Sequence, residues 1–277
     1  MLKFQITQPI KLANRALLHI NGADAAEFLQ GQISNDIDLI KTSNAIHALI
    51  LTPQGKILAD LFVYNYKTGY LLELDSQIVD WLIKRLQMYR LRSDVSIEDL
   101  SQDLDIVISQ QPLKTAFICA ADPRLTAVDQ PAPLRNVVSS AEGYKTRNDA
   151  EYQQYLAQQA MATFGVDYQA AEFFPQDLWY DKLASTNFTK GCYVGQEVVS
   201  RMRHKSTARK RLMPLFSRAE IQLDQPITYQ QKTVGQALSQ MKITDGYLIL
   251  AVMRQDKLPS DTDILDDVEV RRPAWTM

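Results

Sequence analysis

The chain has 277 residues, of which 46% are hydrophobic and 22% charged, with ten Gly, eleven Pro and two Cys. This balance excludes a disordered chain, a collagen-like repeat and a coiled-coil rod, and the length is typical of about two domains. The net charge of −2 argues against a wholly basic nucleic-acid-binding protein. Two cysteines are too few for a disulfide framework or an all-cysteine metal site, so we expect no stable metal.

The start of the chain and its apolar runs bear on membrane contact and compartment. Residues 1–18 lack the charged and apolar regions of a secretory signal and contain Pro9. The longest apolar stretches, such as residues 248–253, are far shorter than the roughly 18 residues that a membrane helix needs. We therefore expect a cytoplasmic protein without membrane contact.

Apolar periodicity predicts short strands and three helices. The first half is predicted to form strands at residues 2–6, 16–20, 45–51, 57–66, 70–74, 95–97 and 106–108, and helices at 24–31 and 77–91. Pro53 and Gly55 supply the turn of one hairpin. Residues 112–141, which include Pro123, Pro131 and Pro133, are predicted to be irregular. A third helix over 150–164 is followed by strands at 211–216, 232–238, 247–252 and 268–271. The class is α+β, and the strand-rich tail predicts a small antiparallel barrel or sandwich.

Positive charge is concentrated between residues 190 and 218. This segment holds one acid, Glu197, and eight basic residues: Lys190, Arg201, Arg203, Lys205, Arg209, Lys210, Arg211 and Arg218. Such a run attracts an anion when it gathers on one face. A solvated pair of basic strands is the alternative, and the spacing leaves both readings open.

Residues 190–197 read Lys-Gly-Cys-Tyr-Val-Gly-Gln-Glu and form the densest candidate for chemistry. The two glycines allow the backbone to approach a ligand closely. Cys192 follows Lys190 by two residues, and a positive neighbour favours the thiolate form of a cysteine. The alternative is a buried small apolar residue, which is the role we expect for Cys119 in the apolar run 116–121.

This octapeptide resembles the K-G-C-Y-x-G-Q-E signature of the YgfZ family, folate-binding proteins related to the T-protein (GcvT) of the glycine cleavage system. Other segments match the family in the expected order. Residues 28–36 are similar to its F-L-Q-G-Q-x-[ST]-N-D block and residues 53–56 to its P-x-G-[KR] turn. Residues 89–95, 173–176 and 234–235 also fit. The resemblance covers nearly the whole chain.

The resemblance implies a fold and a division of the chain. It predicts an α+β, GcvT-like ring of three modules around a central folate-binding hole, with a C-terminal antiparallel β-barrel. Residues 1–205 would form the folate-binding region as two interleaved α+β modules. Residues 206–277 would form the barrel module.

The resemblance also implies the cofactor, tetrahydrofolate or a related folate, and the residues of a site. Cys192 and Asp36 would carry any chemistry, with Asp36 beside the reactive nitrogens of the folate. The implied folate-binding residues are Gln32, Asn35, Asp36, Asp177, Lys190, Tyr193, Gln196, Glu197 and Arg201. Taken without the family, Asp36 is equally well explained as an acid that caps a turn or helix.

We expect a folate-linked accessory factor for iron–sulfur cluster assembly or repair, which supports enzymes such as the tRNA methylthiotransferase. Its partners would be iron–sulfur enzymes or assembly factors, with Cys192 as a redox-sensitive thiol or cluster contact and Lys190 tuning its ionisation. One cysteine cannot hold a cluster alone, so any cluster would be shared.

Two alternatives stay open. One is a tetrahydrofolate-dependent aminomethyltransferase, although residues 158–165 hold no Asp or Glu where relatives carry an acid. The other is a tRNA-binding module, which would make a weak tRNA contact through the basic run between Arg201 and Arg211.

Overall fold

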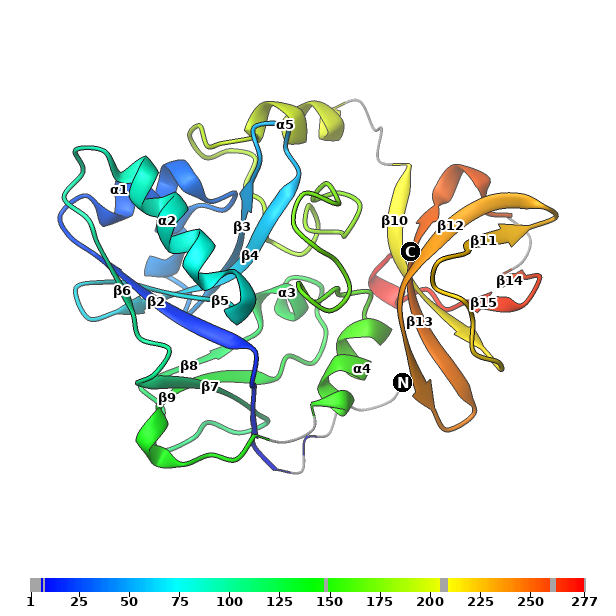
Figure 1. Ribbon diagram of the computed structural model, residues 1–277, viewed down its shortest axis with the longest axis horizontal. Helices are drawn as coiled ribbons and strands as arrows, with labels where there is room; N and C mark the ends of the chain where they lie inside the picture. Colours follow the sequence, from blue (N-terminus) through cyan, green and yellow to red (C-terminus); the bar gives the residue numbers. More distant parts are fainter. Residues whose placement is uncertain (1–5, 7, 147–148, 205–208, 260–262, 277) are drawn as a thin grey trace.

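Three antiparallel β-sheets organise the part of the chain that the computed structural model describes, namely residues 6, 8–146, 149–204, 209–259 and 263–276. Two of them form the N-terminal part of the molecule, and the third forms a β-rich unit at the other end (Figure 1). Helices alternate with strands in the first part, so the expected α+β class is confirmed.

The first sheet has five strands and is covered by helices on one face. Its strands are, in spatial order, β3 (Ile46–Leu51), β4 (Ile57–Tyr66), β5 (Gly69–Asp75), β2 (Arg15–Asn21) and β6 (Ser96–Asp99). Because side chains alternate between the faces of a strand, Leu18 and Val63 pack in the core beneath α1 (Ala25–Gln32) and α2 (Val79–Arg90). Their neighbours Leu17 and Phe62 enter a second core on the opposite face.

The second sheet corrects the expectation that residues 112–141 are irregular. It has four strands in the order β1 (Ile10–Lys11), β7 (Leu104–Ser109), β9 (Leu134–Ser139) and β8 (Ile118–Ala121), and α3 (Pro123–Thr126) joins the last two along the chain. The prolines do not prevent this structure. Pro123 stands in the first turn of α3, where no amide hydrogen bond is lost, and Asp122 caps the helix by accepting from the backbone N–H of Arg124.

The third sheet is a nearly closed six-stranded barrel (Figure 1). Its strand order is β11 (Pro226–Tyr229), β12 (Lys232–Ile243), β13 (Gly246–Arg254), β10 (Lys210–Ser217), β15 (Val268–Val270) and β14 (Ile264–Leu265). All four strands expected in this tail are therefore confirmed. Leu215, Ile249 and Ala251 fill the interior. On the outside, Leu212 belongs to the core shared with the N-terminal part, and its carbonyl accepts from Trp179 Nε1 at 2.7 Å.

Two helices differ from expectation. α4 (Ala150–Gln158) is shorter than predicted, because the chain turns at Ala160, which has a φ of +53°. α5 (Gln196–His204) lies inside the basic run, so the first part of that run is a helix and the interpretation as two strands is wrong. Short 3-10 helices span Ile37–Lys41, Ser76–Ile78, Ser140–Glu142, Gln255–Lys257 and Ala274–Thr276.

Some expectations fall on segments that the structure does not cover. The predicted strand at residues 2–6 lies outside the described residues except for Ile6. The predicted boundary between residues 205 and 206 also lies outside them. Within the described residues, no helix combines the length and the apolar character needed to cross a membrane.

Candidate functional site

Lys190 joins the cysteine segment to the end of α1. Its side chain is buried, and its ammonium donates to the carbonyls of Gln30 at 2.8 Å, Ile33 at 2.8 Å and Asn35 at 2.7 Å. The last carbonyls of a helix have no partner within the helix, so a cation there satisfies them. Burial lowers the pKa of Lys190 to about 8, while Asp36 acts in the opposite direction. Two motifs that are far apart in the sequence thus meet through one side chain.

The position of Lys190 changes its expected role. Cys192 is exposed, whereas the ammonium of Lys190 points at the three carbonyls. Among the described residues, no hydrogen bond links Lys190 to the thiol of Cys192. Lys190 therefore anchors the backbone of the cysteine segment, and the expectation that it tunes the ionisation of Cys192 finds no contact to support it.

The glycines fix the other end of this segment. Gly195 has a φ of +86°, and a Cβ placed there would lie 2.5 Å from the carbonyl oxygen of Thr52. Gly55, in the hairpin turn after β3, has a φ of +81° and faces the carbonyl of Gly195. Both positions favour glycine, since other residues are strained at positive φ. A Cβ at Gly195 would also clash with backbone, and one at Gly55 would lie 3.0 Å from the Cβ of Val198. Three family-like motifs therefore meet at the two ends of the segment that carries Cys192.

Asp36 and Asn35 lie at the junction between α1 and the following 3-10 helix. Asp36 is half-buried, and its Oδ1 accepts from Gln30 Nε2 at 2.8 Å and from the backbone N–H of Asp38 at 3.1 Å. Asn35 is buried, and its Nδ2 donates to the carbonyls of His47 at 2.8 Å and Ala184 at 2.7 Å. The protein itself thus uses the amide of Asn35, whereas Oδ2 of Asp36 has no hydrogen-bond partner among the described residues.

Two buried side chains on these segments carry polar atoms without a partner in the described structure. They are Gln32, through Oε1, and Tyr193, through its hydroxyl. Burial raises the pKa of Tyr193 to about 12, so its hydroxyl keeps its proton and is available as a donor. Buried polar atoms are normally paired, and an exception indicates a water molecule or a ligand.

The remaining predicted residues are spread along α5 and beyond. Gln196 and Glu197 form its first turn, and Arg201 is exposed one turn later. Asp177 lies elsewhere. Its Oδ2 accepts from the backbone N–H of Phe174 at 3.1 Å, its carbonyl accepts from the N–H of Leu212 at 2.8 Å, and burial raises its pKa.

The basic run does not gather on one face. Lys190 is buried on carbonyls, Arg211 pairs with Asp181 at 2.6 Å, and the guanidinium of Arg203 lies 4.0 Å from the centre of the Phe188 ring. Arg218 lines a hollow on the barrel. Lys205 lies outside the described residues. The excess of basic residues between 190 and 218 therefore does not form a single anion site within the described structure.

A buried charge cluster lies between the first two sheets, and no sequence pattern predicts it. Glu73 on β5 accepts from Arg135 on β9, from Arg15 Nε at 2.7 Å and from the hydroxyl of Tyr64 at 2.6 Å. The guanidinium of Arg135 also lies 3.9 Å from the centre of the Phe62 ring. No periodic signal marks Glu73, because every residue from 71 to 75 is buried. A cavity of about 30 Å³ beside this cluster has room for about one water.

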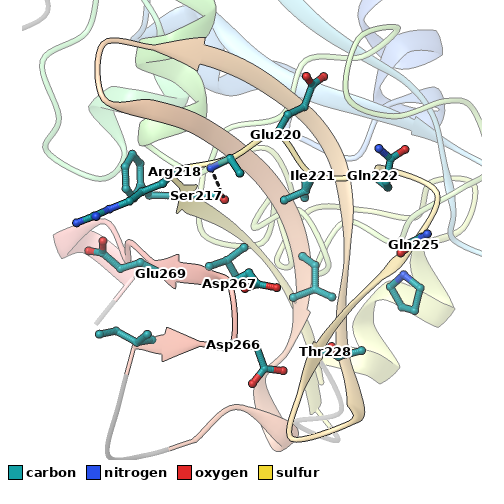
Figure 2. A pocket seen from close by; sticks show the side chains of 16 residues that line it. Ser217, Arg218, Glu220, Ile221, Gln222, Gln225, Thr228, Asp266, Asp267 and Glu269 are labelled. Carbon is teal, nitrogen blue, oxygen red and sulfur yellow. Dashed lines mark hydrogen bonds between the residues drawn. The ribbon is translucent and has the colours of Figure 1, made fainter.

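A larger hollow of about 760 Å³ lies on the barrel, between β10, β11 and the turn from β14 to β15 (Figure 2). Asp266, Asp267 and Glu269 contribute to its lining, and no predicted site residue does. Among the described residues, no group of three or more His, Cys, Asp or Glu is placed to hold a metal ion.

Comparison with solved structures defines the fold. The aminomethyltransferase T of the glycine cleavage system from Bartonella henselae matches 96% of this chain and 85% of its own, with a TM-score of 0.67 and 13% identity. The chain thus has the GcvT-like fold, with mixed helices and sheets and a nearly closed barrel.

Sequence comparison then shows which proteins the chain is similar to. No protein-family model matches the chain. The iron–sulfur cluster assembly factor IBA57 homolog of Mycosarcoma maydis is 30% identical over 74% of this chain, and mouse IBA57 is 26% identical over 90%. The tRNA-modifying protein YgfZ of Hamiltonella defensa is 26% identical over 89%. The matches span 56%, 78% and 83% of those three proteins, so the chain covers little more than half of its fungal relative. The chain is thus a homologue of IBA57 and YgfZ proteins, which belong to the GcvT-like family.

Proposed function

We propose that this protein is an accessory factor in iron–sulfur cluster assembly and that Cys192 is its point of contact with a cluster. The observation that carries the proposal is the exposed thiol of Cys192 on a segment held at both ends, by Lys190 and by Gly195. The names of the IBA57 relatives, which are cluster assembly factors, support the same role.

The chemistry of this contact follows from the ligand set. A thiol binds iron as the thiolate, so Cys192 releases its proton when it becomes a ligand. A cluster needs about four protein ligands. Since the described residues offer no metal-binding group, the other ligands come from the partner protein. The fixed backbone on either side of Cys192 presents the thiol without a cost in loop ordering.

Replacing Cys192 by alanine tests this role against Cys119→Ala. Cys119 is the other cysteine and lies half-buried on β8, less buried than expected of a core residue. In a strain that lacks its own relative of this protein, we expect Cys192→Ala to lose about tenfold or more of the rescued activity of an iron–sulfur enzyme such as tRNA methylthiotransferase. Cys119→Ala should rescue as well as the wild type. Full rescue by Cys192→Ala would remove the thiol from the mechanism.

We also propose that the protein binds tetrahydrofolate and that its modules form the ring with a central hole implied by the family. The cavity of about 30 Å³ does not fit a pterin, so we do not assign the ligand to it. The chemistry of Asp36 fits better, because Oδ2 is available to accept from the N–H donors of a pterin. Gln32 and Tyr193 add buried polar atoms without partners on the adjoining segments.

Calorimetric titration with tetrahydrofolate tests the folate proposal. We expect saturable one-to-one binding that weakens about tenfold or more in Asp36→Asn, which removes one charged hydrogen bond. The amide preserves a side-chain oxygen that can cap the 3-10 helix, so the variant should fold normally. Binding that is equal in both proteins would place the folate away from Asp36, and no binding to the wild type would reject the proposal.

Two further elements belong to the proposal. A weak tRNA contact is favoured by Arg201 and Arg203, which are exposed on α5, and by the name of the Hamiltonella defensa relative, a tRNA-modifying protein.

The two free cysteines support a reducing compartment, for which we propose the cytoplasm. The aminomethyltransferase alternative draws on a likeness of fold at 13% identity, and no residue observation favours it.

A further inference from the structure

The outer face of α2 exposes large apolar side chains to an unusual degree. Nine large hydrophobic residues of the described structure are exposed, and four of them lie between residues 81 and 91. They are Trp81, Met88, Tyr89 and Leu91, with exposed fractions of 41%, 68%, 37% and 86%. Scattered single residues of this kind need no explanation, but a group on one helix indicates a contact surface.

Trp81 and Tyr89 form a stripe along α2 with Arg85 between them. Trp81, Arg85 and Tyr89 are four residues apart, so they lie along one side of the helix. The guanidinium of Arg85 lies 5.8 Å from the centre of the Trp81 ring and 4.7 Å from that of the Tyr89 ring. Leu82 and Leu86 are buried beneath α2 against the five-stranded sheet, and α2 lies on the outside of that sheet (Figure 1). Trp, Tyr, Met and Arg are the residue types that interface cores favour.

Leu91 is held in this position under strain. It follows the last residue of α2 with a φ of +46° and a ψ of −107°, a conformation that suits glycine and disfavours leucine. Burial within this protein cannot offset that strain, since the side chain is almost fully exposed. A contact with another molecule would offset it.

The charge of the surface indicates the chemistry of the molecule that it binds. Residues 79–95 hold four basic residues, Lys84, Arg85, Arg90 and Arg92, against the two acids Asp80 and Asp94. The straight stripe along a helix of three turns matches a second helix laid against it. We propose that this face of α2, with Leu91, docks an amphipathic helix of a partner protein whose apolar side is flanked by Asp or Glu.

The stripe is connected to the cysteine segment. Nη2 of Arg85 lies 3.4 Å from the carbonyl of Leu51, and a Cβ placed at Gly195 would lie 3.0 Å from the Cβ of Leu51. Arg85 on α2 and Gly195 in the cysteine segment therefore both lie against Leu51. Because of this link, we take the docked partner to be the protein that shares the cluster with Cys192. In that respect alone the inference rests on the proposed function.

Fluorescence anisotropy with a designed peptide tests the docking surface. The probe is a labelled helix of about 18 residues, roughly five turns, with leucine on one face and glutamate on both flanks. Its control has lysine in place of glutamate. We expect saturable binding of the acidic peptide to the full chain. The affinity for the basic peptide should be lower by about tenfold or more.

Three variants separate docking from folding. Trp81→Ala should weaken binding of the acidic peptide about tenfold. Leu91→Gly should weaken it about fivefold while the melting temperature stays equal or rises, because glycine relieves the strained backbone. Phe117→Ala, which removes an exposed side chain outside the stripe, should bind as the wild type does. Wild-type binding by both Trp81→Ala and Leu91→Gly, or equal binding of the two peptides, would overturn the inference.

The same assay keeps the two proposals apart. Cys192→Ala should bind the acidic peptide normally, because the thiol is not part of the stripe. If the peptide fails to bind while Cys192→Ala still loses the rescued activity, the docking inference is wrong and the proposed function stands. Peptide binding that depends on Trp81, together with full rescue by Cys192→Ala, would support the surface and reject the cluster role.

Discussion

Replacing Glu73 by glutamine is expected to lower the free energy of unfolding by about 3–5 kcal/mol, the usual cost of removing one partner from a buried ion pair. Glu73 is fully buried and is contacted by Arg135 and Arg15, both themselves buried or nearly so. Glutamine keeps the volume but leaves the two guanidinium groups without their counter-charge in the core. Urea unfolding of the wild type and the variant measures the difference.

Two controls make this result specific. Glu269 pairs with Arg271 on the surface at 3.4 Å, and Glu269→Ala should change the free energy of unfolding by less than about 1 kcal/mol. The double variant Glu73→Leu with Arg135→Met replaces the pair by apolar side chains and should recover part of the loss. A single Glu73→Gln variant as stable as the wild type would show that the cluster does not hold the two sheets together.

Acid unfolding provides a second readout of the same cluster. Burial alone would raise the pKa of Glu73, but Arg135 and Arg15 outweigh it and lower the pKa to about 2 from the ordinary 4.5. A lowered pKa contributes stability that is complete above the ordinary value and is lost as the pH falls towards the folded one. We therefore expect the stability of the wild type to fall between about pH 4.5 and pH 2, and to fall less in Glu73→Gln.

Replacing Gly195 by alanine is expected to displace the cysteine segment and to cost about 2 kcal/mol or more. Alanine is strained at a φ of +86°. Its Cβ would also lie 2.5 Å from the carbonyl oxygen of Thr52, a contact that only a backbone shift can relieve. The shift would move the segment that presents Cys192. Denaturant unfolding measures the cost, and the rate at which Cys192 reacts with a thiol reagent reports the change of its surroundings.

Gly191 provides the matched control, because it flanks Cys192 on the other side. A Cβ at Gly191 would meet nothing within 4 Å, and its φ is not positive. Gly191→Ala should therefore leave the stability within about 0.5 kcal/mol of the wild type and the thiol reactivity unchanged. Equal behaviour of the two variants would mean that the contact between Gly195 and the hairpin turn does not position the thiol.

Local patterns predicted much of the fold. The alternation of apolar residues marked β2 to β5 and the main strands of the barrel, and helical spacing marked α2, because each of these elements buries one face or both. The prediction was wrong at residues 112–141, where prolines suggested irregular structure. Pro123 opens a helix there, and β9 gains its place through pairing with both β7 and β8, which local sequence does not reveal.

The candidate site divides in the same way. The sequence by itself determined the motifs, the resemblance to a family and the choice of Cys192, since these are properties of neighbouring residues. Only the tertiary structure decided that Lys190 would bind carbonyls more than 150 residues away, and that Glu73 would meet Arg135 across 62 residues. The physical reason is that a buried charge must find a partner or a cluster of dipoles, and long-range packing alone determines which one lies within reach.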